Sequence, residues 1–226
     1  MQPRLSVIIP ALDAAGTLPA TLDALSAWTG GLDLILVDGG SSDGTVRLAT
    51  GHGARVLRTG RGRGLQLAAG AAAATGDWLL LLHADTVPAP GWDGAVAGFL
   101  DDPDNRERAG YFRFALDDAS PPARRLERLV AWRCRTLALP YGDQGLLLSR
   151  SLYRAVGGVR PLPLMEDVDL VRRLGRPRLV PLAAAAVTSA EKWRRDGWWR
   201  RSARNLLCLS LWYAGVPPRL IRRVYG

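Results

Sequence analysis

The stretch GDWLLLLHADT, residues 76–86, carries the clearest structural signal in the sequence. Its four consecutive leucines predict a strand buried on both faces, because a strand with one solvated face alternates apolar and polar residues. The leucines lead directly into His83 and Asp85, so a carboxylate follows the point where the chain leaves the predicted core. We therefore expect a central strand over residues 77–83, with Asp85 held at a fixed place beside its end.

Similar apolar runs precede this stretch, and helical patterns separate them. Strands are predicted at residues 5–10, 32–38 and 54–58, and helices at 17–28, 41–50 and 64–76. Regular alternation of strand and helix predicts a parallel sheet with right-handed crossovers. The expected fold class is α/β, with a Rossmann-type, mostly parallel sheet flanked by helices.

Acidic residues follow three of these strands. The first strand leads to Asp13, the second ends at Asp38, and the fourth is followed by Asp85. Ligands of open parallel sheets bind at the carboxyl ends of the strands, so the three carboxylates should gather along one edge. Asp85 suits Mg²⁺ or Mn²⁺ beside a diphosphate, because these cations take oxygen ligands. His83 is either a further ligand or a hydrogen-bonded core residue, and the second reading is favoured.

The loop TGRGRGLQLAAG, residues 59–70, is rich in glycine but does not fit a dinucleotide fingerprint. A G-x-G-x-x-G pattern that starts at Gly62 would need a third glycine at Leu67. Arg61 and Arg63 stand beside a predicted helix N-terminus, where guanidinium groups and backbone N–H groups bind phosphate oxygens. The alternative is a solvated basic loop. The two interpretations are about equally supported for Arg61, and phosphate binding is favoured for Arg63.

The second half of the chain has a different pattern. We predict a strand at 111–116, a helix at 121–139, a loop entering a strand at 140–150, and a helix within 163–175. The last helix begins with Glu166 and Asp167, which either suit the helix dipole or present a general base. No linker divides the chain, so we expect one domain with two halves, 1–116 and 117–190, and a helical tail, 191–226.

Charge is concentrated in that tail. The net charge of the 226 residues is +9, and the last 36 residues, with nine Lys or Arg against two acids, carry +7 of it. Tryptophans lie among these arginines, which predicts either contact with an anionic membrane or packing on the core or a dimer partner. No groove-reading motif indicates nucleic acid binding. The short N-terminal apolar run, the absence of a spanning run and the unpaired spacing of Cys134 and Cys208 predict a cytoplasmic protein, or one peripheral on the inner face of the membrane.

Six motifs occur together and in order. They are LSVIIPALDAAGTL (5–18), LILVDGGSSDGT (34–45), GRGLQLAAGAA (62–72), GDWLLLLHADT (76–86), GDQGLLLSR (142–150) and MEDVDL (165–170). Together they resemble the family 2 glycosyltransferases of the GT-A fold. Within that family the chain is similar to the branch named rSAM/selenodomain-associated transferase 2. The resemblance covers roughly residues 5–175.

The resemblance implies an inverting transfer of a sugar from a nucleoside-diphosphate donor to an acceptor hydroxyl, lipid-linked or soluble, assisted by Mg²⁺ or Mn²⁺. It implies Asp167 as general base with Glu166 beside it, and Asp85 as metal ligand in a D-x-D element whose first Asp is His83 here. The donor site would comprise Pro10, Ala11, Asp13, Asp38, Arg63, Gln66 and Asp85. The acceptor side would comprise Gly142, Asp143, Gln144 and Trp193.

Two other functions fit a similar sheet. A sugar nucleotidyltransferase carries a basic, glycine-rich loop after its first strand, whereas residues 10–18, PALDAAGTL, contain no Arg or Lys. A catalytically inactive binding or scaffold protein is the other option, and the presence of Asp38, Asp85 and Asp167 argues against it.

Overall fold

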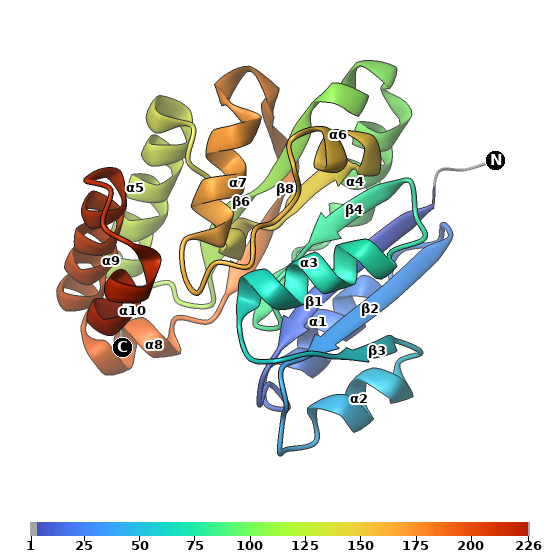
Figure 1. Ribbon diagram of the computed structural model, residues 1–226, viewed down its shortest axis with the longest axis horizontal. Helices are drawn as coiled ribbons and strands as arrows, with labels where there is room; N and C mark the ends of the chain where they lie inside the picture. Colours follow the sequence, from blue (N-terminus) through green and yellow to red (C-terminus); the bar gives the residue numbers. More distant parts are fainter. Residues whose placement is uncertain (1–3, 226) are drawn as a thin grey trace.

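The computed structural model describes residues 4–225, in which eight strands form one sheet (Figure 1). The strands are β1 (Leu5–Ala11), β2 (Leu32–Asp38), β3 (Arg55–Arg58), β4 (Trp78–Leu81), β5 (Thr86–Pro88), β6 (Ala109–Leu116), β7 (Leu146–Ser149) and β8 (Leu179–Thr188). Their order across the sheet is β3-β2-β1-β4-β7-β6-β8-β5.

Ten α-helices flank this sheet in the described part of the chain. They are α1 (Leu18–Leu25), α2 (Thr45–Gly51), α3 (Arg63–Ala73), α4 (Trp92–Asp101), α5 (Pro121–Leu137), α6 (Arg150–Ala155), α7 (Glu166–Leu174), α8 (Glu191–Asp196), α9 (Trp198–Tyr213) and α10 (Pro218–Tyr225). Short 3₁₀ turns occupy Pro103–Glu107, Gly142–Gln144 and Arg176–Arg178.

The first four strands form the predicted parallel unit, which confirms the α/β fold class. β1 pairs in parallel with β2 and β4, and β2 with β3. The second half adds β7, which runs antiparallel to both β4 and β6, whereas β6 and β8 are parallel. With the antiparallel pair of β5 and β8, four of the seven strand pairings are parallel and three are antiparallel.

Side chains of the central strands alternate between two core layers. In β1, Val7 and Ile9 join the layer that α1 and α4 cover, and Ile8 joins the layer that α3, α6 and α7 cover. Figure 1 shows α3 crossing one face of the strands while α1 lies behind them. Leu79 and Leu80 are fully buried in opposite layers, as the run of leucines predicts. The chain therefore leaves the core between two packed faces just before His83.

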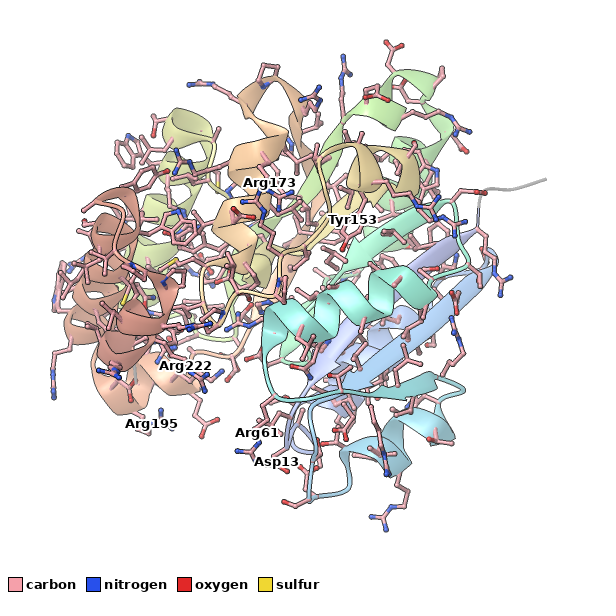
Figure 2. All side chains as sticks on the ribbon, in the orientation of Figure 1. Asp13, Arg61, Tyr153, Arg173, Arg195 and Arg222 are labelled. Carbon is pink, nitrogen blue, oxygen red and sulfur yellow. The ribbon has the colours of Figure 1, made fainter. Side chains whose placement is uncertain are left out.

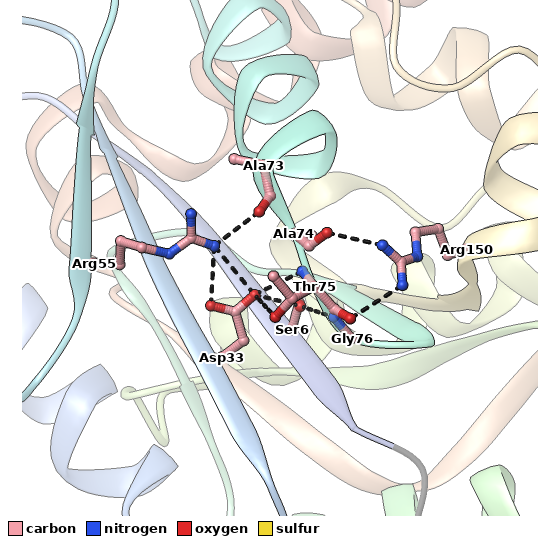
Figure 3. Close-up of polar contacts among 8 residues, drawn as sticks. All are labelled: Ser6, Asp33, Arg55, Ala73, Ala74, Thr75, Gly76 and Arg150. Atoms are coloured by element: carbon pink, nitrogen blue, oxygen red, sulfur yellow. Dashed lines mark hydrogen bonds and ion pairs between the residues drawn. The ribbon is translucent and has the colours of Figure 1, made fainter.

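A polar cluster fixes the amino-terminal end of the sheet, away from the strand ends that lead to the acids (Figure 3). Asp33 of β2 accepts hydrogen bonds from the Ser6 hydroxyl at 2.9 Å, from the Thr75 backbone N–H at 2.8 Å and from Arg55 at 3.1 Å. Arg150 donates to the carbonyls of Ala74 and Thr75. Burial raises the pKa of Asp33, but these donors hold it below its ordinary value. The cluster joins β1, β2, β3 and the turn before β4.

The C-terminal tail forms three helices, α8 to α10, that pack on the rest of the molecule. Trp193 contacts the cluster around Phe114 on β6, Leu209 joins Val168 of α7, and Cys208 packs with Leu164. The tail therefore covers part of the core, as one of the two readings predicted. Within residues 4–225, no helix has both the length and the apolar character needed to cross a membrane.

Gly70 sets how closely α3 approaches the sheet. A Cβ at this position would meet Ile8 of β1 and lie 2.9 Å from Val37 Cγ2 of β2. Gly98 of α4 is exposed, and a Cβ there would meet no atom within 4 Å. Both glycines lie in helices, but only Gly70 is packed against the sheet.

We predict opposite effects of alanine at these two positions. Gly98→Ala should raise the free energy of unfolding by about 0.5–1 kcal/mol, because alanine loses less backbone entropy in a helix. Gly70→Ala should lower it by about 1–3 kcal/mol, because the added methyl group overpacks the layer between α3 and the sheet. Urea unfolding followed by circular dichroism measures both. Equal changes in the two variants would contradict the packing role of Gly70.

Candidate functional site

A cleft of about 490 Å³ lies at the carboxyl ends of β1 and β4. One wall comes from the end of β1, the start of α3 and the loop after β4, and the other comes from residues 164–168 and from helices α8 to α10. In Figure 2, Asp13 and Arg61 mark the sheet side of this region and Arg222 marks the tail side. Segments far apart in the sequence thus enclose one cavity.

Most of the predicted donor residues line this cleft, namely Pro10, Ala11, Asp13, Arg63, Gln66 and Asp85. Gln66 has a clear structural task, since its side-chain amide donates to the Ala11 carbonyl at 2.8 Å and to the Val37 carbonyl at 2.7 Å. Asp13 accepts from the Ser42 N–H at 2.8 Å and has a left-handed backbone with φ of 48°. These bonds fix the loops that form the floor of the cleft.

Asp38 is placed differently from the prediction. Its side chain is buried and does not line the cleft. Its carboxylate accepts the backbone N–H groups of Gly40 and Ser41, at 3.2 Å and 3.0 Å. The carboxylate is thus engaged in the turn that follows β2, and contact with a nucleotide base stays a prediction.

The two acids at the start of α7 have different surroundings. Glu166 is buried, and its Oε1 lies 3.2 Å from Arg63 Nε. Burial raises the pKa of Glu166, and Asp167 adds to this, whereas Arg63 opposes it. Asp167 lines the cleft and accepts the N–H groups of Gly142 and Val168, each at 2.8 Å. The left-handed backbone of Met165, with φ of 66°, turns the chain into this pair.

His83 lies between these groups. Its Nε2 is 3.4 Å from Arg63 Nη1, and a Cβ on Gly142 would come within 2.6 Å of the same nitrogen. Burial and the positive charge of Arg63 lower the pKa of His83 to about 4. The imidazole is therefore uncharged near neutral pH, and only glycine at position 142 leaves room for it.

Asp85 has a partner that sequence reasoning did not identify. The Lys192 ammonium donates to Asp85 Oδ2 at 3.0 Å, and both side chains line the cleft. Burial tends to raise the pKa of Asp85, but His83 and Lys192 bring it below its ordinary value. The one available signal was that Lys192 is the single lysine in a chain that otherwise uses arginine.

The predicted acceptor residues divide into two groups. Asp143 and Trp193 line the cleft, whereas Gly142 and Gln144 do not. Gln144 is buried and ties its loop to the core, because its amide donates to the Phe112 carbonyl at 2.9 Å and its carbonyl accepts from Arg133 at 3.2 Å. Gly142 contributes its backbone N–H, which donates a hydrogen bond to Asp167.

Unpaired polar atoms gather at this cleft. Six buried side-chain polar atoms lack a hydrogen-bond partner in the described residues, and four of them belong to cleft-lining residues: Asp143 Oδ1, Trp193 Nε1, Arg201 Nε and Asn205 Oδ1. Buried polar groups without a partner are rare in folded proteins, so each one needs an explanation. The atoms themselves have almost no exposed surface, although their residues line the cleft. Arg201 and Asn205 come from α9, which sequence reasoning did not include in the site.

Metal ligands are sparse here. Residues 4–225 contain no group of three or more His, Cys, Asp or Glu side chains arranged to hold a metal ion. Asp85, with the uncharged His83 beside it, fits a divalent cation only if a bound ligand supplies most of the remaining oxygens.

Part of the chain matches a known protein family. Residues 6–107 match the model described as glycosyl transferase family 2. This segment, a little under half of the chain, is similar to the family 2 glycosyltransferases. The matched segment includes β1 to β4 and Asp85, together with Arg63 and Gln66.

Curated relatives agree with this result. The chain is 42% identical over 91 residues to a PGL/p-HBAD biosynthesis glycosyltransferase of Mycobacterium bovis, and equally to proteins of the same description in Mycobacterium tuberculosis. The match covers 37% of this chain and 36% of the relative. The chain thus matches about a third of the length of these curated relatives.

Solved structures show that the fold is GT-A-like. A mannosyltransferase from Pyrobaculum calidifontis, solved with GDP-Man and Mn²⁺, aligns with a TM-score of 0.67 and 20% identity, over 95% of this chain and 64% of that one. Glucosyl-3-phosphoglycerate synthase from Mycobacterium tuberculosis aligns with a TM-score of 0.57 and 22% identity, over 83% and 70% of the two chains. The expected fold is confirmed, and the narrower branch within family 2 stays a prediction.

Asp143, which lines the cleft, has a pKa well above its ordinary value. Burial raises its pKa from 3.8 to about 6, with Arg133 opposing the shift and Asp167 adding to it. Between pH 4 and 6 the folded protein then binds more protons than the unfolded chain, so stability falls as the pH rises through this range.

We predict that Asp143→Asn removes this penalty. The variant and the wild type should have similar stability near pH 4, and the variant should gain about 1–3 kcal/mol relative to the wild type by pH 7.5. Urea unfolding at several pH values measures the difference, and Asp101→Asn, at an exposed position, is the control. A difference between Asp143→Asn and the wild type that does not change with pH would contradict the raised pKa.

Proposed function

We propose that this protein is an inverting glycosyltransferase that moves a sugar from a nucleoside-diphosphate donor to an acceptor hydroxyl. The observation that carries the proposal is the convergence of Asp85 and Asp167 on one cleft, with Arg63 at the same cavity, in a chain similar to the family 2 glycosyltransferases. Residues 1–116 would bind most of the donor, and residues 117–190 would supply the base and much of the acceptor side.

The leaving group is the nucleoside diphosphate, so negative charge builds on it as the bond to the sugar breaks. Arg63 points its guanidinium into the cleft region between His83 and Glu166, where it would stabilise that charge. A divalent cation, Mg²⁺ or Mn²⁺, would be held by Asp85 and the uncharged His83, and when bound it supplies Lewis-acid stabilisation of the diphosphate. Support comes from the solved mannosyltransferase with GDP-Man and Mn²⁺ and from glucosyl-3-phosphoglycerate synthase with Mn²⁺ and UDP.

Asp167 would act as the general base. Its two oxygens are oriented by the N–H groups of Gly142 and Val168, which leaves lone pairs free to accept the proton of the acceptor hydroxyl. The hydroxyl oxygen bonds to the anomeric carbon from the face opposite the diphosphate, and the sugar–phosphate bond breaks in the same step. Glu166, held by Arg63, positions Asp167 and does not itself need to contact the acceptor.

The acceptor would lie against the part of the cleft wall formed by Asp143, Trp193, Arg201 and Asn205. This surface offers both donors and acceptors of hydrogen bonds, which suits an acceptor that carries more than one polar group. An aromatic ring beside them suits the apolar face of a sugar or the start of a lipid chain.

We predict that Asp167→Asn lowers donor hydrolysis by about 10²–10⁴-fold while nucleoside-diphosphate binding stays within about twofold, because general-base catalysis acts on the chemical step. The assay follows release of nucleoside diphosphate from UDP-, GDP- and dTDP-sugars with Mn²⁺, and binding is followed by thermal shift. Asp101→Asn serves as control for loss of one acidic charge.

Asp85→Asn should instead abolish the effect of Mn²⁺ on nucleoside-diphosphate binding.

Binding without turnover by the wild type would support the inactive scaffold. Pyrophosphate-dependent formation of a nucleoside triphosphate from a nucleotide sugar would support the nucleotidyltransferase.

We also propose that the tail meets an anionic membrane surface on which a lipid-linked acceptor is presented. Trp199, Leu206 and Tyr213 of α9 are spaced seven residues apart, so they share one helix face, and all are exposed, Trp199 by 76%. Exposed arginines on α8, α9 and α10 would attract acidic lipid headgroups: Arg194, Arg195, Arg200, Arg219, Arg222 and Arg223.

This contact predicts co-flotation with vesicles that contain phosphatidylglycerol, and its loss in the double variant Trp199→Ser/Leu206→Ser. Leu129→Ser on α5, which removes an equally exposed leucine outside the tail, should float like the wild type. Absence of wild-type flotation at low salt would exclude the membrane contact.

A further inference from the structure

A lysine from the C-terminal tail reaches the proposed donor site. Lys192 lies on α8, 107 residues from Asp85 in the sequence, and its ammonium is 3.0 Å from Asp85 Oδ2. The contact lies inside the cleft that Arg63 and Asp167 also line. A surface ion pair of this kind contributes little to stability, so its place in the cleft is the informative feature.

The position of α8 is fixed independently of this contact. The neighbouring Trp193 is buried against Phe114, with ring centroids 6.5 Å apart. The Ala190 N–H donates to Asp117 Oδ1 at 2.6 Å, and Arg194 lies 3.6 Å from Asp118. A packed helix therefore delivers Lys192 to Asp85, and the ion pair is not needed to hold the helix in place.

The charges in the cleft indicate what the Lys192 ammonium could bind. A diphosphate would enter beside the six acidic side chains that line the cavity: Asp13, Asp85, Asp143, Glu166, Asp167 and Glu191. Arg63 is already paired with Glu166. Because His83 stands where the D-x-D pattern has its first Asp, Asp85 contributes the one carboxylate of that element. A cation carried by the protein would compensate for such a sparse set of metal ligands.

We propose that Lys192 is a diphosphate-binding residue, which bridges Asp85 and an oxygen of the nucleoside diphosphate so that the site holds a cation there without a bound metal. The inference rests on the proposed function and extends it to the tail. An ammonium has three N–H donors, and one of them already bonds to Asp85. The remaining donors are free to meet a phosphate oxygen, and the flexible four-carbon stem allows the small shift that this requires.

The test is the affinity for UDP, GDP and dTDP, measured by isothermal titration calorimetry in EDTA and again in Mn²⁺. The wild type should bind at least one of them in EDTA. Lys192→Met keeps the length of the side chain but removes its charge, and it should weaken that binding by ~10-fold or more, as loss of a charge-assisted hydrogen bond predicts. Mn²⁺ should reduce the deficit, because the metal replaces the missing cation at Asp85.

Arg195→Met is the matched control, since it removes a positive charge from the same helix at a side chain that pairs with Asp196. It should bind within about twofold of the wild type, and Lys192→Arg should recover part of the affinity. Circular dichroism and melting temperature establish that each variant is folded.

Two results would overturn the inference separately from the proposed function. If Lys192→Met binds in EDTA as the wild type does, or if the wild type binds only with Mn²⁺, Lys192 is merely the counter-ion of Asp85. If neither the wild type nor any variant binds a nucleoside diphosphate in either buffer, the proposed donor site is wrong. The proposed role of Lys192 is then wrong as well.

Discussion

The compensation of buried negative charge is the constraint on which the rest of this structure depends. Six acidic side chains line one cleft, and moving a charge out of water is costly unless a cation or a hydrogen-bond donor meets it. Arg63 meets Glu166, Lys192 meets Asp85, and backbone N–H groups meet Asp167. Asp143 has no such partner for its Oδ1, and burial raises its pKa to about 6. The distribution of partners thus decides which acid keeps its proton to a higher pH than the others.

Glycines beside the cleft allow these charged groups to come together, because a side chain at these positions would clash with neighbouring atoms. A Cβ on Gly64 would lie 2.6 Å from the Arg160 carbonyl, so a glycine is needed for the segment before α7 to cross the start of α3. That crossing brings Glu166 to Arg63. Gly39, directly after β2, lies against Gln66, whose amide nitrogen would be 3.1 Å from an added Cβ. Gly39 and Gly64 therefore allow close packing next to the proposed phosphate site.

The sequence predicted the first half of the fold well and the second half less completely. Apolar runs such as Leu79–Leu82 are buried because burial on both faces requires that composition. β8 was not predicted, because its centre is Ala183–Ala186, and alanine has a low preference for strands. Its extended backbone comes from pairing with β6 on one side and β5 on the other. The three antiparallel pairings were also not predicted, because each joins strands that are distant in the sequence.

The candidate site shows the same division. Asp85 and Asp167 were located from the sequence because each directly follows a recognisable local signal, a buried strand in one case and a helix start in the other. Asp38 was expected at the cleft, yet its carboxylate bonds to its own turn, since a free backbone N–H two or three residues away is the nearest donor. Arg201 and Asn205 were not found, because no local pattern marks them, and Lys192 is distinguished only by being the single lysine.

The sequence by itself determined which segments are buried strands and which acids stand at their ends. Those properties depend on the order of apolar and polar side chains over a few residues, and periodicity records that order directly. Only the tertiary structure decided which charges meet, and that the tail forms a wall of the cleft. Electrostatic energy depends on distance in space, and the 107 residues that separate Asp85 from Lys192 say nothing of the 3.0 Å between their charged groups.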